Sequence, residues 1–423
     1  MTFLLGTATA AHQVEGNNTN SDFWAMEHQT HSIFTEPSGA AVDHYHHYQE
    51  DIALMQQAGL NAYRFSIEWA RIQPTPTTFD EAALAHYQAV IDACLAAGLE
   101  PVVTLMHFSS PKWLISQGGW EADSVVPAFA KYVEYVITRL GDKLHYVCTI
   151  NEANMGIQIA AIAQRIMRQM GIKLQAGINL PLPKEMQLQN AESEQVFGLA
   201  KGQTPQTFLS QRTPHGDELI MAAHRAAVVV IRRVAPQLKV GLTLSLHDLQ
   251  PVDDSAATKE NLTAAWADEF THYLPAIADD DFLGVQCYSR ELIGPQGVQP
   301  APADAPMTQM DYEDYPAAIG HVLQTVAKDF KQPLIVTENG IATDDDERRC
   351  VFLKQAAQSV QTAIDTGVPV HGYFCWSLLD NFEWQKGFAK HFGVVAVDRQ
   401  TQTRHAKKSL QVLGQLQFKE GAQ

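Results

Sequence analysis

The sequence predicts a parallel (β/α)8 barrel that residues 1–423 form as a single domain. Three observations lead to this fold class. Short β-type runs alternate with longer stretches of helical period, the runs number eight, and no Gly-rich phosphate loop follows the first of them. Such alternation is typical of a parallel barrel and not of a sandwich or a helical bundle. A doubly wound open sheet is the competing fold, and the count of eight and the lack of a phosphate loop make it the weaker alternative.

The eight predicted strands are spread over the whole chain. In order they are FLLGTAT (3–9), AYRFSIEW (62–69), EPVVTLM (100–106), YVCTINEA (146–153), KVGLTLSL (239–246), FLGVQCYS (282–289), PLIVTENG (333–340) and VHGYFCWSL (370–378). The first run imitates the apolar core of a secretion signal, but no basic segment precedes it. Because the barrel needs it as a first strand, we interpret it as structural.

Helices are predicted most clearly over 44–59, 79–98 and 347–367, where apolar residues recur at helical spacing and each stretch ends at a glycine. Two long connections should lie at the C-terminal ends of strands. The first, 157–216, is rich in Gln and is expected to hold one helix and a long irregular loop. It would either roof the active site or form a surface excursion. The second, 291–311, is rich in Pro and Ala and would share that rim.

The composition argues against several classes of partner. The formal charge of −17, from 30 basic and 47 acidic residues, disfavours nucleic acid and anionic membrane surfaces. No apolar run approaches the roughly 18 residues of a membrane span. The five cysteines show no paired spacing, which argues against a disulfide framework and suits a reducing compartment. We expect a cytoplasmic protein, and its oligomeric state is left open.

The chemistry should lie at the C-terminal ends of the strands, where barrels place their functional side chains. Two such ends carry glutamates, Glu152 in TINEA and Glu338 in VTENG. Two facing glutamates beside a sugar ring are the usual apparatus for breaking a glycosidic bond. Either one alone could be a structural salt bridge, whereas the pair indicates catalysis. Further polar and aromatic residues at these ends suit sugar hydroxyls and ring faces. They are Gln13, Arg64, His107, Asn151, His247, Tyr288, Trp376, Glu383 and Trp384.

Several segments together resemble glycoside hydrolase family 1, the β-glucosidase family. They are GTATAAHQVEG (6–16), NAYRFSIEWARI (61–72), HF and PKWL within 107–114, TINEA (149–153), DFLGVQCYS (281–289), VTENG (336–340), and YFCWSLLDNFEW with HFGVVAVD behind it (373–398). These segments follow the order found in the family and span nearly the whole chain. TENG alone would be suggestive, but the set is highly specific.

The resemblance implies roles for the catalytic residues. Glu338 would be the nucleophile and Glu152 the acid/base. Arg64 and the Tyr288 hydroxyl would lower the pKa of Glu338, whereas burial and the Glu338 charge would raise that of Glu152. Asn151 would bind the sugar 2-hydroxyl. A retaining pair implies carboxyls roughly 5–5.5 Å apart and a covalent glycosyl-enzyme.

The resemblance also implies a sugar pocket. Its glycone-binding positions match Gln13, His107, Asn151, Glu383 and Trp384, and Trp376 would be the stacking floor. The branch of the family that acts on 6-phosphosugars replaces Glu383 with a residue that tolerates phosphate. A glutamate there would repel phosphate and bind the 4- and 6-hydroxyls, so an unphosphorylated glycone is predicted.

Five positions depart from the family pattern, one of them Cys287, which replaces the first Tyr of the usual Asn-Tyr-Tyr. Ala153 replaces the usual proline after the acid/base, and Phe108 replaces a Trp. Gln286 replaces an Asn, which leaves its hydrogen bonds in the site open, and His12 stands where an aromatic residue commonly precedes Gln13. These changes could alter the preference for leaving groups.

A metal site is a competing interpretation of the tract DHYHHY (43–48), because His-rich tracts can bind zinc. Acidic ligands at matching strand ends are not evident, and the family carries a similar run without metal. We therefore predict partly exposed histidines at a helix start and no metal site. Cys148 and Cys287 are predicted to be core residues and not nucleophiles.

The predicted function is hydrolysis, with retention, of terminal non-reducing β-D-glucosides, as small molecules or oligosaccharides, without a cofactor. Activity on β-galactosides or β-fucosides would fit as well. Within the same chemistry, a transglycosylase or a 6-phospho-β-glucosidase is an alternative. From other classes, the alternatives are a non-catalytic glycan-binding barrel, which the intact Glu152 and Glu338 disfavour, and a metal-dependent hydrolase using His44, His46 and His47.

Overall fold

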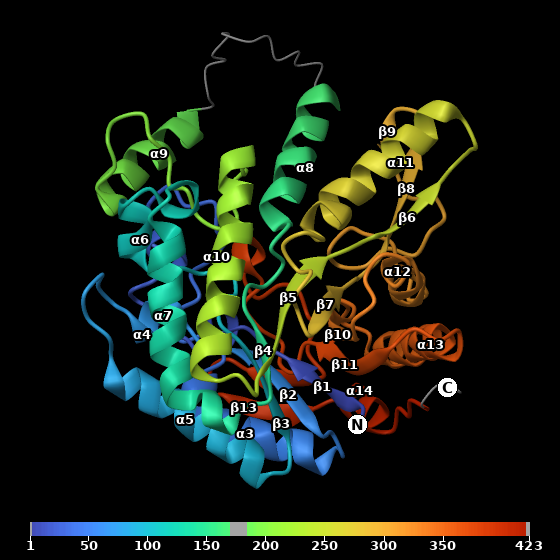
Figure 1. Ribbon diagram of the computed structural model, residues 1–423, viewed down its shortest axis with the longest axis horizontal. Coiled ribbons are helices and arrows are strands. Elements are labelled where there is room, and N and C mark those ends of the chain that lie inside the picture. The colour runs from blue at the N-terminus through green and yellow to red at the C-terminus, as the bar shows by residue number, and fades with distance from the viewer. Residues whose placement is uncertain (1, 170–183, 420–423) are drawn as a thin grey trace.

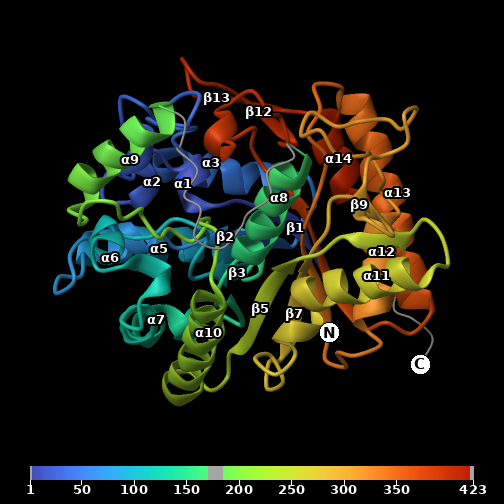
Figure 2. The same ribbon diagram turned by 90° about the horizontal axis from the view of Figure 1, so that it is seen from above.

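The centre of the protein is a closed barrel of eight parallel strands (Figure 1, Figure 2). The computed structural model describes residues 2–169 and 184–419. Around the barrel the order is β1-β11-β10-β7-β5-β4-β3-β2, and every neighbouring pair is parallel. The strands are β1 (Leu4–Ala8), β2 (Ala62–Ser66), β3 (Glu100–Thr104), β4 (Tyr146–Cys148), β5 (Lys239–Ser245), β7 (Phe282–Gln286), β10 (Leu334–Asn339) and β11 (Val370–Trp376). Each lies within one of the eight predicted runs, so the predicted fold class is confirmed.

Helices form the outer layer around the barrel (Figure 2). The three that the sequence predicts most clearly are α3 (His44–Gln57), α5 (Glu81–Ala96) and α13 (Asp346–Asp365). In α5 and α13 the residue before the helix is an aspartate whose carboxylate accepts hydrogen bonds from first-turn N–H groups, a favoured N-cap. The other outer helices are α7 (Val125–Leu140), α10 (Pro214–Val234), α11 (Ala256–Glu269), α12 (Ala318–Val326) and α14 (Lys408–Gly414). Short helices are α1 (Ala11–Val14), α2 (Asp22–Glu27), α4 (Trp69–Ile72), α6 (Lys112–Ser116), η1 (Gly119–Glu121), η2 (Gly141–Lys143), η3 (Thr271–Tyr273) and η4 (Trp384–Lys386).

The connection after β4 differs from the prediction. Instead of one helix and a long irregular loop, it contains two helices, α8 (Met155–Gln169) and α9 (Lys184–Phe197), and residues 170–183 lie outside the described part. The sequence of α9 consists largely of good helix formers, but only Ser193 and Phe197 are buried, so it shows no apolar period to detect. Figure 1 shows both helices beyond the C-terminal ends of the strands. α9 docks on the segment between β1 and α3, where Gln29 Nε2 donates to Ser193 Oγ (3.0 Å).

Two small sheets supplement the barrel. One consists of β6 (Asp248–Pro251), β8 (Arg290–Gly294) and β9 (Gly297–Gln299). The predicted connection over 291–311 therefore begins with two strands. The other sheet is the hairpin of β12 (Val395–Asp398) and β13 (Thr403–Ala406), which follows β11.

Two apolar cores hold the barrel together. One fills the barrel itself, and the other lies between the strands and the outer helices. Cys148 belongs to the inner core and Cys287 to the outer core, and both are buried, as predicted. Trp376 is part of the inner core at the end of β11, so its ring forms the upper boundary of the apolar interior. Within the described ranges, no helix combines the length and apolar character needed to cross a membrane.

Candidate active site

Glu338 lies near the end of β10 and is held by two donors. Arg64 Nη1, from β2, donates to Glu338 Oε1 (2.7 Å), and the hydroxyl of Tyr288, just after β7, donates to Oε2 (2.7 Å). Arg64 and Glu338 are almost completely buried. Burial raises the pKa of Glu338, while Arg64 and Tyr288 act in the opposite direction, as the sequence predicts. In the free protein burial outweighs them, so the pKa of Glu338 lies above its ordinary value.

Glu152 follows β4 with an unusual backbone conformation. Its φ is 44°, in the left-handed region that residues with a side chain seldom adopt. Its N–H donates to Thr243 Oγ1 (2.9 Å), and the N–H of Ala153 donates to the Thr243 carbonyl (3.1 Å). A proline at position 153 would lack that second donor. Two bonds to one residue of β5 thus hold the strained turn in place.

The environment of Glu152 favours its protonated form. Burial is the largest cause that raises its pKa well above the ordinary value, and the charge of Glu338 adds to the rise. Arg64 and His247 oppose it. Among the described residues, no hydrogen-bond donor contacts the Glu152 carboxylate in the way that Arg64 and Tyr288 contact that of Glu338. The pKa of Glu152 therefore rises further than that of Glu338, and Glu152 is the carboxyl that keeps its proton.

Asn151 connects the carboxyl pair to the sugar side of the site. Its Oδ1 accepts from Arg64 Nη2 (2.5 Å) and from Gln286 Nε2 (2.9 Å), and its Nδ2 lies 3.2 Å from His107 Nε2. The longer side chain of Gln286 therefore reaches Asn151 directly. Burial, followed by the charge of Arg64, holds the pKa of His107 well below its ordinary value, so this imidazole is neutral. Its buried Nδ1 has no hydrogen-bonding partner in the described part of the protein.

Gln13 and Glu383 form a second polar group beyond β1 and β11, the strands next to those that carry Arg64 and Glu338. Gln13 Nε2 donates to the Phe382 carbonyl (2.8 Å) and to Glu383 Oε2 (3.2 Å). The buried Oε1 of Gln13 has no partner among the residues described. Burial and the charge of Glu338 raise the pKa of Glu383 to about 8, against the effect of the Gln13 hydrogen bond. Glu383 is thus mostly protonated at pH 7, which revises the sequence argument that its charge repels phosphate.

Aromatic rings form a nearly parallel row through this group. The ring of His12 lies 5.8 Å from Trp384 at an interplanar angle of 3°. Trp384 lies 6.3 Å from His107 at 19°, and His107 lies 5.6 Å from Trp376 at 20°. Phe108 contacts Trp384 from the side at 5.3 Å. The row provides flat apolar surface next to the free Gln13 and His107 atoms, the combination that a sugar ring requires.

Comparison with known proteins identifies the arrangement. The family model described as glycosyl hydrolase family 1 matches residues 1–165 and 269–421. The chain belongs to glycosyl hydrolase family 1. It is therefore a glycoside hydrolase, and the resemblance in its motifs is confirmed.

Individual relatives cover almost the whole chain. β-Glucosidase A of Thermotoga maritima is 29% identical over 96% of this chain and 95% of its own length. The bifunctional β-D-glucosidase/β-D-fucosidase of Bifidobacterium breve is 29% identical over 96% of this chain and 95% of its own length. The solved apo structure of β-glucosidase 1317 has a TM-score of 0.87 and 37% identity, and the match covers 98% of both chains.

Some residues of this family 1 site were not predicted from the sequence. Thr243 on β5 binds the Glu152 backbone, and its Oγ1 lies 3.3 Å from Asn151 Oδ1. Tyr312 lies 6.4 Å from Tyr288, ring to ring, and burial and the charge of Glu383 raise its pKa. The strand alternation of β5 could have indicated an inward Thr243. Tyr312 lies in a rim segment that shows no such periodicity.

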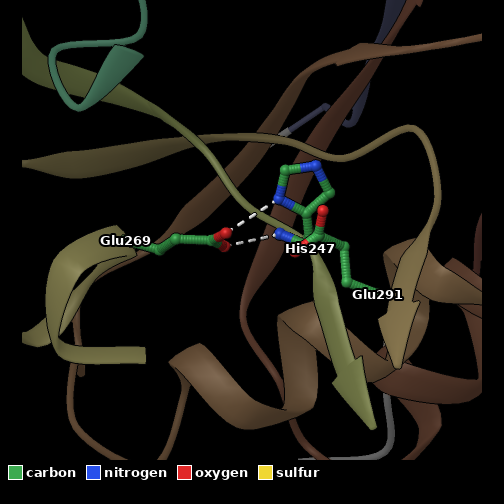
Figure 3. A group of neighbouring side chains, drawn as sticks. All are labelled: His247, Glu269 and Glu291. Atoms are coloured by element: carbon green, nitrogen blue, oxygen red, sulfur yellow. Dashed lines mark hydrogen bonds and ion pairs between the residues drawn. The ribbon is translucent and has the colours of Figure 1, made fainter. Parts of the chain in front are cut away.

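Figure 3 shows a cluster of possible ligand residues beyond the C-terminal end of β5, formed by His247, Glu269 and Glu291. One possible ligand atom from each lies within 4.8 Å of the others. His247 Nδ1 and its backbone N–H already contact the two oxygens of Glu269, both at 2.8 Å. We therefore interpret the cluster as an ion pair with a second carboxylate beside it.

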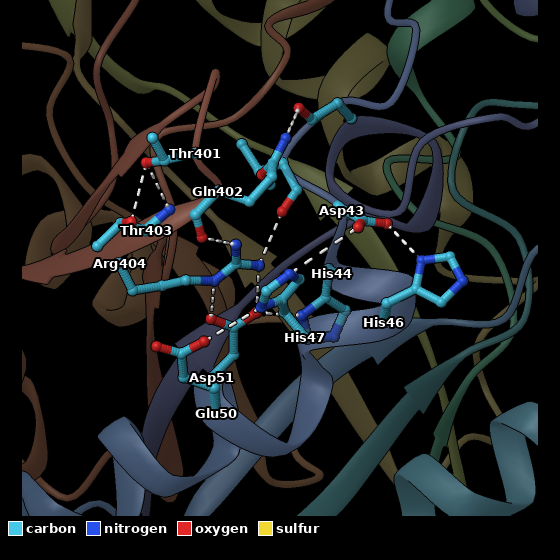
Figure 4. A network of polar contacts seen from close by, with 12 residues as sticks. Asp43, His44, His46, His47, Glu50, Asp51, Thr401, Gln402, Thr403 and Arg404 are labelled. Carbon is cyan, nitrogen blue, oxygen red and sulfur yellow. Dashed lines mark hydrogen bonds and ion pairs between the residues drawn. The ribbon is translucent and has the colours of Figure 1, made fainter.

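The histidine tract of 43–48 contacts carboxylates around the start of α3 (Figure 4). The buried His44 lies 2.7 Å from Asp51, through Nδ1 and Oδ2, and Arg404 Nε of β13 donates to the other Asp51 oxygen (2.9 Å). His46 and His47 each face a different nearby carboxylate. The tract thus joins α3 to the C-terminal hairpin. Its lack of a metal role stays a prediction.

Proposed function

We propose that the protein is a retaining β-glycosidase that hydrolyses terminal, non-reducing β-D-glucosyl residues. The observation that carries this proposal is the unequal environment of two buried carboxyls. Glu338 contacts a guanidinium and a hydroxyl donor, whereas Glu152 has its pKa raised well above the ordinary value by burial and by Glu338. A pair of carboxyls held in opposite protonation states is what a nucleophile and a general acid require.

The proposed mechanism has two displacements. In the first, Glu338 attacks the anomeric carbon while Glu152 gives its proton to the glycosidic oxygen, so the aglycone leaves as an alcohol and a glycosyl ester remains on Glu338. In the second, Glu152 takes a proton from water, and the water attacks the anomeric carbon and releases Glu338 as a carboxylate. Asn151, fixed by Arg64 and Gln286, is placed to bind the sugar 2-hydroxyl.

The proposed glycone site combines free polar atoms with the aromatic row. Gln13 Oε1 would accept from a sugar hydroxyl, His107 Nδ1 would donate to one, and Glu383 would bind the hydroxyls at C4 and C6. Trp376 and Trp384 would contact the apolar face of the ring. Names of relatives include both β-glucosidase and β-D-fucosidase, which supports a pocket that tolerates changes at these positions.

An unphosphorylated glycone remains part of the proposal, with a changed physical reason. Because Glu383 is mostly neutral at pH 7, it does not repel phosphate by its own charge. A phosphate dianion would nevertheless enter a pocket that holds three buried carboxyls, with Arg64 already engaged by Glu338 and Asn151. We also propose that residues 1–423 form one domain, since the barrel uses strands from both ends of the chain.

Turnover of an aryl β-D-glucoside and of the matching aryl 6-phospho-β-D-glucoside tests the proposal, with wild type beside Glu338→Gln. The expected result is activity on the unphosphorylated substrate that the variant loses. Preference for the phosphorylated substrate would overturn the assignment of the glycone. Substantial activity in the variant would overturn the assignment of the nucleophile. Proton NMR of the first-formed anomer distinguishes retention from inversion.

A further inference from the structure

His247 lies two residues beyond β5, beside the strand that carries Glu152. β4 and β5 are neighbours in the barrel. The side chain of Asn154 joins them beyond their ends: it accepts from Ser245 N (3.0 Å) and donates to the Ser245 carbonyl (2.6 Å) and to the Glu269 carbonyl (2.9 Å). The turn of Glu152, the end of β5 and the end of α11 are thus fastened together by one amide.

Glu269 fixes the orientation and the charge of His247. One Glu269 oxygen contacts the backbone N–H of His247 and the other contacts Nδ1, both at 2.8 Å (Figure 3). This bidentate contact leaves Nε2 free of hydrogen-bonding partners in the described residues, and 30% of the His247 side chain is exposed. Burial alone would lower the pKa of His247, but Glu269, followed by Glu291 and Glu152, raises it to about 9. His247 is therefore an imidazolium at neutral pH.

We propose that His247, oriented by Glu269, is a positioning residue that supplies a fixed positive charge beside the acid/base Glu152. The inference rests on the proposed role of Glu152. β5 stands opposite β1 in the barrel, so this charge lies on the side of the site away from the strand that precedes Gln13. The family match is interrupted over residues 166–268, a range that contains His247, so family membership does not imply this role.

Four charged residues change the pKa of Glu152. Glu338 and Glu383 raise its pKa by their negative charge, and Arg64 and His247 lower it. Arg64 is also bound to Glu338, whereas His247 has no contact with the nucleophile. Once Glu338 becomes an ester, the positive charge of His247 favours the ionised form of Glu152, which is the form that acts as base on water. Its charge thus assists the change of Glu152 from acid to base.

Two variants remove the charge without removing the hydrogen bond. In His247→Asn, the amide Nδ2 takes the place of Nδ1 as donor to Glu269. In Glu269→Gln, the amide oxygen still accepts from the backbone N–H of His247, and the amide NH2 can donate to Nδ1 when the ring is neutral, so the contact is kept while the carboxylate that keeps the ring protonated is lost. His145→Asn is the matched control, because His145 also faces a carboxylate, Glu100 at 3.0 Å, but lies before β4 at the other end of the barrel.

The measurement is the pH dependence of kcat/KM for an aryl β-D-glucoside. The alkaline limb reports the loss of the proton from the general acid. Both variants should move that limb to higher pH by roughly one unit, the scale of one charge–charge interaction inside a protein, and the control should not move it. A merely structural role would lower activity or thermal stability without moving the limb. If the alkaline limb of kcat/KM lies at the same pH in both variants as in the wild type, the proposal is overturned.

A second readout does not need activity. The His247 ring should titrate near pH 9 by NMR, and Glu152→Gln should lower that value, because the two charges act on each other equally. An unchanged His247 titration in Glu152→Gln would overturn the inference, even in an active enzyme. If the wild type fails to hydrolyse any β-glycoside, the proposed function is wrong, while a lowered titration would still support the coupling between the two residues.

Discussion

Replacing Tyr288 with phenylalanine removes one of the two side-chain donors that favour the ionised form of Glu338, the proposed nucleophile. The Tyr288 hydroxyl donates to Glu338 Oε2 at 2.7 Å, while Arg64 binds the other oxygen. Tyr288→Phe removes that single donor and leaves the ion pair in place. Because the hydrogen bond stabilises the carboxylate form, its removal must raise the pKa of Glu338.

The size of the shift follows from the type of hydrogen bond. A hydrogen bond to a charged group contributes about 1.5–3 kcal/mol, and about 1.36 kcal/mol corresponds to one pKa unit. Glu338 is buried and Tyr288 is partly buried, so solvent screens only part of this contribution. The pKa of Glu338 should therefore rise by about one to two units. The acid limb of kcat/KM, which requires an ionised nucleophile in the free enzyme, should move up in pH by the same amount.

The assay is a pH profile of kcat/KM for wild type, Tyr288→Phe and a control. Tyr132→Phe on α7 is the control, since the Tyr132 hydroxyl is buried but donates to the Leu105 carbonyl (2.9 Å) and not to a carboxylate. It should cost about 1 kcal/mol of unfolding free energy without moving either limb. An acid limb of Tyr288→Phe that coincides with wild type, in a folded protein, would refute the reasoning.

Three further predictions test other parts of the structure. Glu338→Gly should abolish hydrolysis yet support synthesis from an α-glycosyl fluoride, because the vacated space accepts the inverted anomer; residual hydrolysis without synthesis would contradict the nucleophile assignment. Glu383→Ser should lower glucoside turnover and raise the relative rate on the 6-phosphoglucoside; an unchanged ratio would remove the role given to Glu383. Arg404→Met should cost about 3–5 kcal/mol in unfolding free energy, because it removes the guanidinium from the buried Asp51 and leaves His44 as its remaining ion-pair partner. The pKa of Asp51 is lowered in the folded state, so this contribution is present at neutral pH and fades as pH falls below about 4. Arg399→Met, at an exposed ion pair, is the control and should cost less than about 1 kcal/mol in the same denaturant titration.

The barrel could be predicted from the sequence because each of its strands is buried on both faces. Burial on both faces makes a strand a short apolar run, and the end of a run then locates a functional position. That is how Glu152 and Glu338 could be placed at the C-terminal ends of the fourth and seventh strands before any coordinates. The helix α9 shows the converse. It is largely exposed and polar, so its sequence has no apolar residues at helical spacing, and the sequence therefore indicated an irregular loop.

The partners and protonation states in the site were harder to predict. The ion pair of His247 with Glu269 joins the end of β5 to the end of α11, and nothing in either segment alone indicates that they meet. The protonation of Glu383 likewise depends on burial and on its distance from Glu338, which a motif does not encode. A glutamate in a motif therefore indicates where the carboxyl lies, but not how its surroundings change its pKa.

Three buried carboxyls share this site, and the number of cations in contact with them decides their roles. Glu152, Glu338 and Glu383 are all buried, and in the described part of the chain Arg64 is the cation that forms an ion pair with any of them. Three ionised carboxylates beside one guanidinium would cost far more than one, because burial penalises each uncompensated charge. The carboxyl that touches Arg64 is therefore the one that ionises most easily, and the pKa of the others rises in its field. Arg64 lowers the pKa of both Glu338 and Glu152, so perturbing Arg64 should shift both limbs of the pH profile to higher pH, whereas Tyr288→Phe should move the acid limb alone.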